Sequence, residues 1–250
     1  MLLTMHDIYA GYEGGDILKG VSLQVAQGTT TCIVGPNGAG KSTVLRVLSG
    51  LLRPRQGEII FDDRSIIGLA PRHILALGIV QVAQSHSLFP AISVQENVRL
   101  GAYMLRDKTL VEQRLREVEE MFPIVKTRAR DKAGNLSGGQ QRLVEFARCL
   151  MLDPRLILLD EPSMGLDPKT FKLVVEKIKL MQESGRTIIL VEQNVRTGLS
   201  LATNGIVLES GRVRLEGPPT EILNNPEIAH LYLFQRPQAE QVRTKLPPLS

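Results

Sequence analysis

Nine consecutive residues have the types and spacing of a phosphate-binding loop. They are Gly35, Pro36, Asn37, Gly38, Ala39, Gly40, Lys41, Ser42 and Thr43, which fit the pattern G-x-x-x-x-G-K-[ST]. In such a loop the glycines let successive backbone N–H groups surround an anion. The lysine reaches the β- and γ-phosphates of a nucleotide, and the serine hydroxyl can ligate Mg²⁺. These residues therefore predict a nucleotide-binding site.

The segments on either side of the loop predict the context that this chemistry needs. Residues 29–34 form a β-branched run typical of a buried strand, and residues 42–48 predict a helix that Gly50 ends. The helix N-terminus would add its dipole to the attraction for phosphate. A Gly-rich turn that matches the pattern by chance would lack this strand and helix, so we prefer the functional interpretation.

Two carboxylates end another apolar run. Asp160 and Glu161 follow residues 156–159, and Pro162 stops the predicted strand. In P-loop nucleoside triphosphatases, a carboxylate at such a strand end helps to hold Mg²⁺ opposite the phosphate loop. We therefore assign this role to Asp160. Glu161 is then placed to orient and deprotonate a water that attacks the γ-phosphate in line. A solvated turn is the alternative for this acidic pair.

Gln84 and Tyr12 are weaker candidates when each is taken alone. Gln84 follows a predicted strand over residues 79–82, and open α/β sheets bind ligands beyond the carboxyl ends of their strands. Its amide could touch Mg²⁺ or the attacking water, although an isolated glutamine fits an ordinary surface residue better. Tyr12 could stack on a purine ring, but a surface or core tyrosine explains this single residue better.

A second candidate anion site opens the helix predicted near residue 137. Its residues are Leu136, Ser137, Gly138, Gly139 and Gln140. A Ser-Gly-Gly helix start leaves N–H groups free and points the helix dipole at whatever binds there. Ser137 is also a good N-cap, so a helix that is merely capped explains the sequence about equally well.

The composition is that of a globular chain. Its 250 residues can bury one large core with a subdomain, and its net charge of +4 comes from scattered basic residues. Such scattering favours a solvated surface over a nucleic-acid interface. We expect no signal peptide and no membrane-spanning segment, and we interpret Cys32 and Cys149 as core residues in a reducing compartment. A role at a membrane would therefore need another chain to span the bilayer.

The order of predicted elements indicates an α/β fold with two additions. Residues 1–28 predict antiparallel strands, and residues 86–135 predict a mostly helical insertion. Further strands are predicted at residues 187–191 and in a hairpin over residues 206–215. The stretch 236–250 has no core pattern and is predicted to be a flexible tail.

The chain resembles ATP-binding cassette (ABC) ATPases, because it carries their motifs in the same order. These motifs are the phosphate loop, Gln84, residues 136–140 and residues 158–167. The resemblance covers about residues 1–235 and implies one domain, with a helical signature subdomain at about 86–150. It implies a P-loop (RecA-like) ATPase core that carries an N-terminal antiparallel β subdomain and uses ATP and Mg²⁺. Such domains pair head to tail, and each ATP meets the phosphate loop of one subunit and the signature residues 136–140 of the other.

The same resemblance implies roles for single residues. Tyr12 would stack on adenine, and Asp167 would lie in a loop that signals across the dimer. Gln84 would sense Mg²⁺ and a transmembrane partner, and with Ser42 and Asp160 it would complete the Mg²⁺ ligands. The helical insertion would receive a short helix from a membrane permease subunit, which implies a peripheral place at the cytoplasmic face of the membrane.

Within the superfamily, residues 88–97, 189–194 and 207–211 look like the LivF-type ATPase of branched-chain and hydrophobic amino-acid importers. Such importers use two different ATPase subunits and an extracytoplasmic substrate-binding protein. The resemblance therefore implies a heterodimer, with a homodimer as the fallback. Gln84 is often glutamate and Asp167 is often alanine in that group, which leaves import of urea or short amides as an alternative.

Gln193 stands where most cassettes carry a histidine that hydrogen-bonds the γ-phosphate region. A glutamine can donate a hydrogen bond but does not titrate near neutral pH. We therefore place Gln193 beside Glu161 and Gln84 among the candidate catalytic residues. We also hypothesise that this chain's own phosphate-loop site hydrolyses ATP more slowly than a site that bears the histidine.

The alternative from another class is a soluble cassette ATPase that acts on nucleic acid, ribosomes or protein assembly. Fewer than a hundred residues separate Ser42 from Leu136, which leaves no room for the long coiled coils of chromosome and repair relatives. Translation-type relatives usually carry two cassettes, and this sequence carries one phosphate loop. An exporter or lipid-extraction ATPase would differ from an importer only in its membrane partner.

Overall fold

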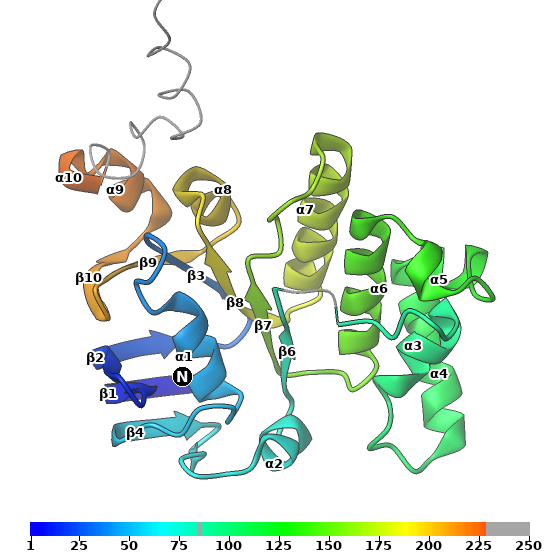
Figure 1. The fold of residues 1–250 in the computed structure, drawn as a ribbon, viewed down its shortest axis with the longest axis horizontal. Helices are drawn as coiled ribbons and strands as arrows, with labels where there is room; N and C mark the ends of the chain where they lie inside the picture. The colour runs from blue at the N-terminus through cyan, green and yellow to red at the C-terminus, as the bar shows by residue number, and fades with distance from the viewer. Residues whose placement is uncertain (85–86, 229–250) are drawn as a thin grey trace, which may run out of the picture.

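Two β-sheets organise residues 1–84 and 87–228, which are the residues that the computed structural model describes (Figure 1). The strands are β1 (Leu3–Tyr12), β2 (Gly15–Val25), β3 (Thr30–Val34), β4 (Gln56–Phe61), β5 (Arg64–Ser65), β6 (Ile79–Val82), β7 (Leu156–Asp160), β8 (Thr187–Glu192), β9 (Asn204–Glu209) and β10 (Arg212–Gly217). The helices are α1 (Lys41–Leu48), α2 (Pro71–Ala76), α3 (Val94–Leu100), α4 (Lys108–Met121), α5 (Ile124–Thr127), the 3₁₀ helix η1 (Ala133–Asn135), α6 (Gly138–Leu150), α7 (Pro168–Glu183), α8 (Val195–Ser200), α9 (Pro219–Asn224) and α10 (Pro226–Ile228).

The larger sheet positions the candidate site. Its strand order is β10-β9-β3-β8-β7-β6, and the strands from β9 to β6 run parallel to one another. β3, β7 and β8 are buried along their whole length, which explains their continuous apolar sequences. Because the carboxyl ends of parallel strands meet at one edge, the segments that follow β3, β6, β7 and β8 come together there.

The smaller sheet is antiparallel and has the order β2-β1-β4-β5. The antiparallel strands predicted within residues 1–28 are confirmed as β1 and β2. β4 follows the phosphate-loop helix in the chain, yet it joins the same sheet, with Leu3 opposite Phe61 and Met5 opposite Ile59. These side chains share one core with the buried face of α1. Such a long-range pairing leaves no local pattern, so the sequence alone does not place β4 in this sheet.

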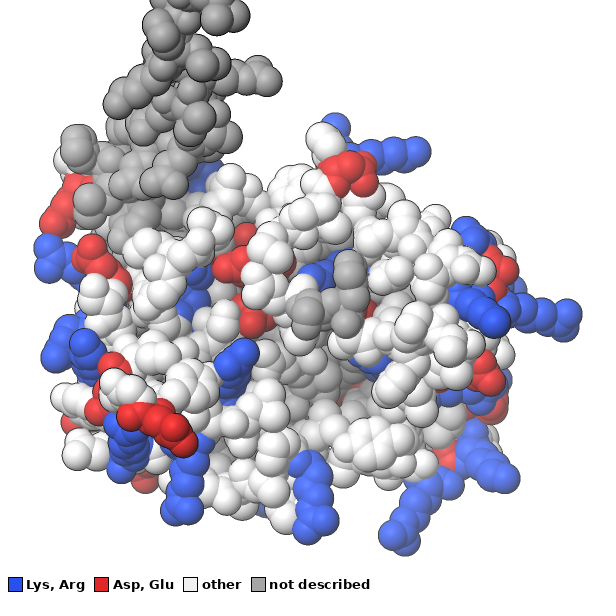
Figure 2. Space-filling view, viewed as in Figure 1, with Lys and Arg blue, Asp and Glu red and all other residues white. Residues whose placement is uncertain are grey.

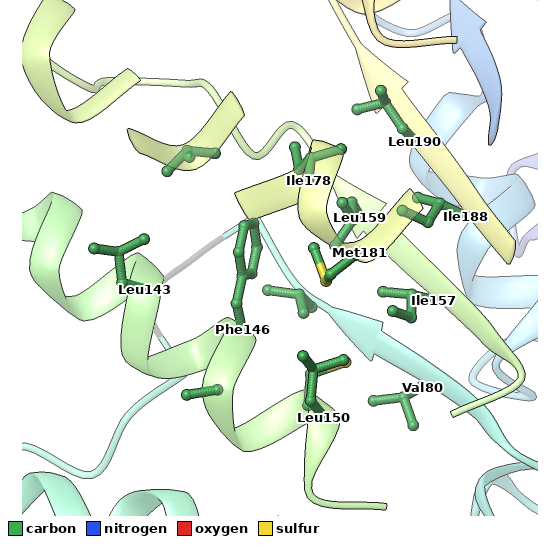
Figure 3. Close-up of a cluster of buried hydrophobic side chains, with 14 of the residues drawn as sticks. Val80, Leu143, Phe146, Leu150, Ile157, Leu159, Ile178, Met181, Ile188 and Leu190 are labelled. Atoms are coloured by element: carbon green, nitrogen blue, oxygen red, sulfur yellow. The ribbon is translucent and has the colours of Figure 1, made fainter. Parts of the chain in front are cut away.

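A group of helices lies beside the parallel sheet. α3, α4 and α5 contact α6, which also packs on α7 and β6 (Figure 1). Figure 3 shows this junction, where Phe146 and Leu150 of α6 lie in one apolar cluster with Ile178 and Met181 of α7 and Ile157 of β7. The α/β fold class with an antiparallel sheet and a helical group is confirmed, while the exact domain limits stay a prediction.

Two further expectations concern the ends and the surface. The predicted tail at 236–250 lies outside the described residues. Within residues 1–84 and 87–228, no helix is both long enough and apolar enough to cross a bilayer. On the face drawn in Figure 2, basic and acidic side chains are interspersed around the edge, and the middle is mostly uncharged.

Candidate active site

The phosphate loop joins β3 to α1 and leaves the helix start open. Gly40 is the N-cap residue of α1 with φ of 105°, a conformation that side chains rarely adopt. A Cβ on Gly40 would lie 2.8 Å from Cδ2 of Leu18 on β2, so the loop packs closely against the smaller sheet. No described side chain caps α1, which leaves the N–H groups of its first turn for a bound anion.

Lys41 begins α1, and its side chain turns back over the loop. Its Nζ donates to the carbonyl oxygens of Gly35, at 2.9 Å, and Pro36, at 3.0 Å, and lies 4.0 Å from Oε1 of Glu161. Burial lowers the pKa of the Lys41 ammonium, and the charges of Glu161 and Asp160 oppose that shift. An ammonium held by weakly basic carbonyls is positioned to exchange them for phosphate oxygens.

Ser42 and Asp160 meet across the crevice between α1 and the end of β7. The Ser42 hydroxyl donates a hydrogen bond to Oδ1 of Asp160 at 2.9 Å, although the two residues lie 118 positions apart. Burial raises the pKa of Asp160, and the bond from Ser42 opposes the rise. These hard oxygen donors fit Mg²⁺, which takes one or two protein ligands and completes its octahedron with phosphate oxygens and water.

Glu161 and Gln84 form a second pair at the same edge. Nε2 of Gln84 lies 3.0 Å from Oε2 of Glu161 and 3.1 Å from Sδ of Met164. Together with Lys41, Ser42 and Gln193, both residues line a cleft of about 450 Å³. The structure therefore brings the predicted loop, the amide and the acid into one cavity.

Tyr12 lies at the rim of this region and not in the cleft. Tyr12 is 43% exposed, and its hydroxyl accepts a hydrogen bond of 2.5 Å from Nη1 of Arg46 on α1. The Arg46 guanidinium carbon is 6.0 Å from the ring centroid. Among the described residues, the cleft is lined by Ile17 in place of Tyr12, a residue that the sequence analysis missed because an isoleucine in a strand carries no chemical signal.

The signature residues open α6 with a capping box. The Ser137 hydroxyl accepts from the Gln140 N–H at 3.4 Å, and Oε1 of Gln140 accepts from the Ser137 N–H at 3.0 Å. Gly138 is exposed, whereas Leu136 and Gly139 are buried. Within the described part of the chain, none of these five residues lines the cleft that holds the phosphate loop. An anion at this helix start would therefore be a different one from the anion at the loop.

Asp167 caps the N-terminus of α7 with its carboxylate. Its Oδ1 accepts from the N–H groups of Lys169, at 3.0 Å, and Thr170, at 3.1 Å, and its Oδ2 accepts from the Thr170 hydroxyl at 2.6 Å. These bonds lower the pKa of the Asp167 carboxyl. The carboxylate thus fixes the direction in which the preceding loop enters α7.

Glu192 is a buried acid that the sequence analysis did not single out. It ends β8, is 2% exposed, and its Oε1 accepts a hydrogen bond of 3.1 Å from the N–H of Ser163. Burial raises the pKa of Glu192, and the charge of Glu161 adds to the rise. The available signal was the one that identified Asp160, namely an acid directly after an apolar run.

A second cavity, of about 480 Å³, lies between β6 and the helices α3 and α6. Three exposed apolar side chains line it, those of Phe89, Leu100 and Tyr103. At its wall, the Glu145 carboxylate of α6 accepts hydrogen bonds from the N–H and hydroxyl of Ser87, at 2.5 and 3.0 Å. We call this cavity the helical groove.

Comparisons with known proteins agree on the class of site. The sequence profile described as ABC transporter matches residues 18–164. The branched-chain amino acid transport ATP-binding protein BraG of Pseudomonas aeruginosa is 34% identical over 93% of this chain and 99% of its own length. LivF of Archaeoglobus fulgidus, named as a probable branched-chain amino acid transport ATP-binding protein, is 34% identical over 92% of this chain and 98% of its own. The lipopolysaccharide export ATP-binding protein LptB of Escherichia coli is 36% identical over 92% and 96%.

Solved structures give the same fold. The ADP conformation of the cassette MJ1267 matches with a TM-score of 0.84 at 28% identity, covering 94% of this chain and 99% of that one. A dimeric post-hydrolysis structure of the cassette MJ0796, bound to ADP and Pi, matches with a TM-score of 0.77 at 29% identity, covering 87% of this chain and 98% of that one.

Proposed function

The chain belongs to the ABC transporter family and is an ATPase of that family, and from this premise we propose that it is the ATP-hydrolysing subunit of a membrane importer. The observation that carries the proposal is the meeting of Ser42 with Asp160, and of Gln84 with Glu161, beside one phosphate loop. Similarity to BraG and LivF supports branched-chain or other hydrophobic amino acids as the cargo. Import of urea or short amides is the alternative within the same class.

The site residues divide the work of phosphoryl transfer to water. The open N–H groups of the loop and α1 bind the phosphates, and Lys41 moves from the Gly35 and Pro36 carbonyls to the β- and γ-oxygens. Ser42 and Asp160 would hold Mg²⁺, which would neutralise charge on the phosphates. Gln84 and Gln193 both line the cleft, where their amide N–H groups can donate hydrogen bonds.

Glu161 orients the attacking water and accepts its proton as the oxygen bonds to the γ-phosphorus. The bond to the ADP oxygen breaks in the same displacement, and ADP carries away the released electron pair. The present hydrogen bond from Gln84 engages Oε2 of Glu161. An ionised carboxylate has two acceptor oxygens, so Oε1 is left to accept a hydrogen bond from the water.

We propose a head-to-tail dimer because the signature residues lie outside the chain's own cleft. The start of α6 offers Ser137 and Gly138 at the surface, where they can meet the nucleotide of a second subunit. The dimeric state of the MJ0796 cassette supports this arrangement. A different ATPase subunit is the preferred partner, as expected from the LivF-type resemblance, and a second copy of this chain is the fallback.

We further propose that the helical groove receives a short helix of a membrane permease at the cytoplasmic face. Phe89, Leu100 and Tyr103 expose an apolar lining that one amphipathic helix would cover. An extracytoplasmic substrate-binding protein would act through the permease. Similarity to LptB supports a second candidate, an export or lipid-extraction ATPase, which would use the same groove with another membrane partner.

The test replaces Glu161 by glutamine in the full chain. Glu161→Gln should abolish Mg-dependent ATP hydrolysis, retain ATP binding and accumulate dimers in ATP, because the water loses its proton acceptor while the phosphate contacts remain. The control is Glu176→Gln, an exposed glutamate on α7. Hydrolysis at the wild-type rate in Glu161→Gln would remove Glu161 from its role. Co-purification from the native membrane with a polytopic subunit would support transport, whereas ribosomes or DNA in its place would support the soluble alternative.

A further inference from the structure

Glu192 is a buried carboxylate that the hydrolysis scheme above does not use. It is the last residue of β8, a strand that lies between β3 and β7 in the parallel sheet, and only 2% of it is exposed. Among the described residues, those that line the nucleotide cleft do not include Glu192. Its Oε1 instead accepts a hydrogen bond of 3.1 Å from the N–H of Ser163. The buried carboxylate is thus bonded to a short turn that follows β7.

That turn begins at the residue proposed to orient the water. The N–H of Met164 donates to the carbonyl oxygen of Glu161 at 3.1 Å, which closes a β-turn over residues 161–164. Glu161 has φ of 46°, the left-handed conformation that is unfavourable for a residue with a side chain. Such a conformation persists only where its surroundings hold it.

Two residues at the end of β8 accept hydrogen bonds from this turn and hold it in place. The Glu161 N–H donates to the carbonyl oxygen of Val191 at 3.0 Å, and the Ser163 N–H donates to Glu192. Pro162 has no N–H to donate. The last two residues of β8 therefore satisfy every backbone donor of the turn except the one that closes it.

We propose that Glu192 is a positioning residue that aims Glu161 into the cleft by anchoring the turn at residues 161–164 to β8. The Glu161 carboxylate leaves this turn toward Lys41, at 4.0 Å, and Gln84, at 3.0 Å. Without the bond to Ser163, the turn can relax from the left-handed conformation and displace the carboxylate. This inference rests on the proposed function, in which Glu161 orients the attacking water.

Two substitutions separate the hydrogen bond from the charge. Glu192→Gln keeps the reach and an acceptor oxygen but loses the charge, whereas Glu192→Asp keeps the charge but is one methylene too short. We expect Glu192→Gln to retain kcat within about threefold and Glu192→Asp to lower kcat roughly ten- to a hundredfold, with the KM for ATP little changed. Glu176→Asp, at an exposed position of α7, is the matched control.

A second measurement tests the hydrogen bond between Ser163 and Glu192 directly. Hydrogen exchange at the Ser163 amide should be slow in the wild type and in Glu192→Gln, and fast in Glu192→Asp.

Several outcomes would overturn the inference. Loss in Glu192→Gln with Glu192→Asp unimpaired would show that the charge matters and not the bond, and wild-type rates in both would show that neither matters. A parallel fall of ATP affinity and melting temperature in Glu192→Asp would reduce Glu192 to a structural residue. If Glu161→Gln itself still hydrolyses ATP, the proposed function fails; if Glu161→Gln is inactive and Glu192→Asp is not impaired, only this inference fails.

Discussion

Gly139 has a side-chain neighbour that leaves no room for a Cβ. A Cβ built on Gly139 would lie 1.8 Å from Cγ2 of Thr170 and 2.8 Å from its Cβ and Oγ1, whereas carbon atoms in contact are about 3.5–4.0 Å apart. Alanine would gain up to about 1 kcal/mol of helix propensity at this place in α6. The overlap outweighs this gain, because the Thr170 hydroxyl is bonded to Asp167 and cannot turn away freely. Overpacking of this kind typically destabilises by about 1–3 kcal/mol.

We therefore expect Gly139→Ala to lower the melting temperature of the nucleotide-free chain by about 2–12 °C, at about 2–4 °C for each kcal/mol in a chain of this size. Gly14→Ala is the control, since a Cβ there meets nothing within 4 Å. Thr170→Ser removes the clashing methyl group and keeps the bond to Asp167, so the double variant should recover part of the loss. A melting temperature at or above that of the wild type in Gly139→Ala would refute the close packing of α6 on α7.

Three further predictions use the same chain. Burial raises the pKa of Glu192, so the folded state binds more protons than the unfolded state above about pH 4, and the free energy of unfolding falls as pH rises through that window. Glu192→Gln should therefore melt at a higher temperature than the wild type at pH 7, with the difference vanishing below about pH 4; equal melting at all pH values would contradict the buried charge. Phe89→Ala should keep the ATPase rate of the isolated chain within about twofold and lose co-purification with membrane subunits, unlike Leu180→Ala on the exposed face of α7. Gln193→His should raise ATP turnover and add a pH-dependent limb near pH 6–7, measured against the wild type by steady-state kinetics; an unchanged rate would refute the hypothesis that glutamine slows this site.

The sequence could predict those parts of the site whose chemistry is indicated by a few adjacent residues. The phosphate loop, the acids after β7 and the amide after β6 each follow a buried strand, and parallel strands end at one edge. The meeting of Ser42 with Asp160 across 118 positions follows from the P-loop arrangement, in which a carboxylate at a strand end faces the phosphate loop. The catalytic roles themselves stay predictions until the substitutions above are made.

What the sequence could not predict depends on contacts between distant segments. The pairing of β4 with β1, the packing of Gly139 on Thr170 and the bond from Ser163 to Glu192 each join parts of the chain that no local pattern relates. Asp167 has a local role, because its carboxylate caps the first turn of its own helix, α7. Its role across the dimer stays a prediction.

α6 physically joins the nucleotide cleft to the helical groove. Its Arg142 donates to the carbonyl oxygens of Ala83, at 2.7 Å, and Gln84, at 2.8 Å, while its Glu145 accepts from Ser87 in the groove wall. The Gln84 side chain meanwhile contacts Glu161 in the cleft. Since the same helix begins at the signature residues, a shift of α6 would move the cleft amide, the groove wall and the signature residues together. Among the described residues the groove and the cleft share no lining residue, so a displacement of this kind is one route by which a helix bound in the groove would change ATP turnover.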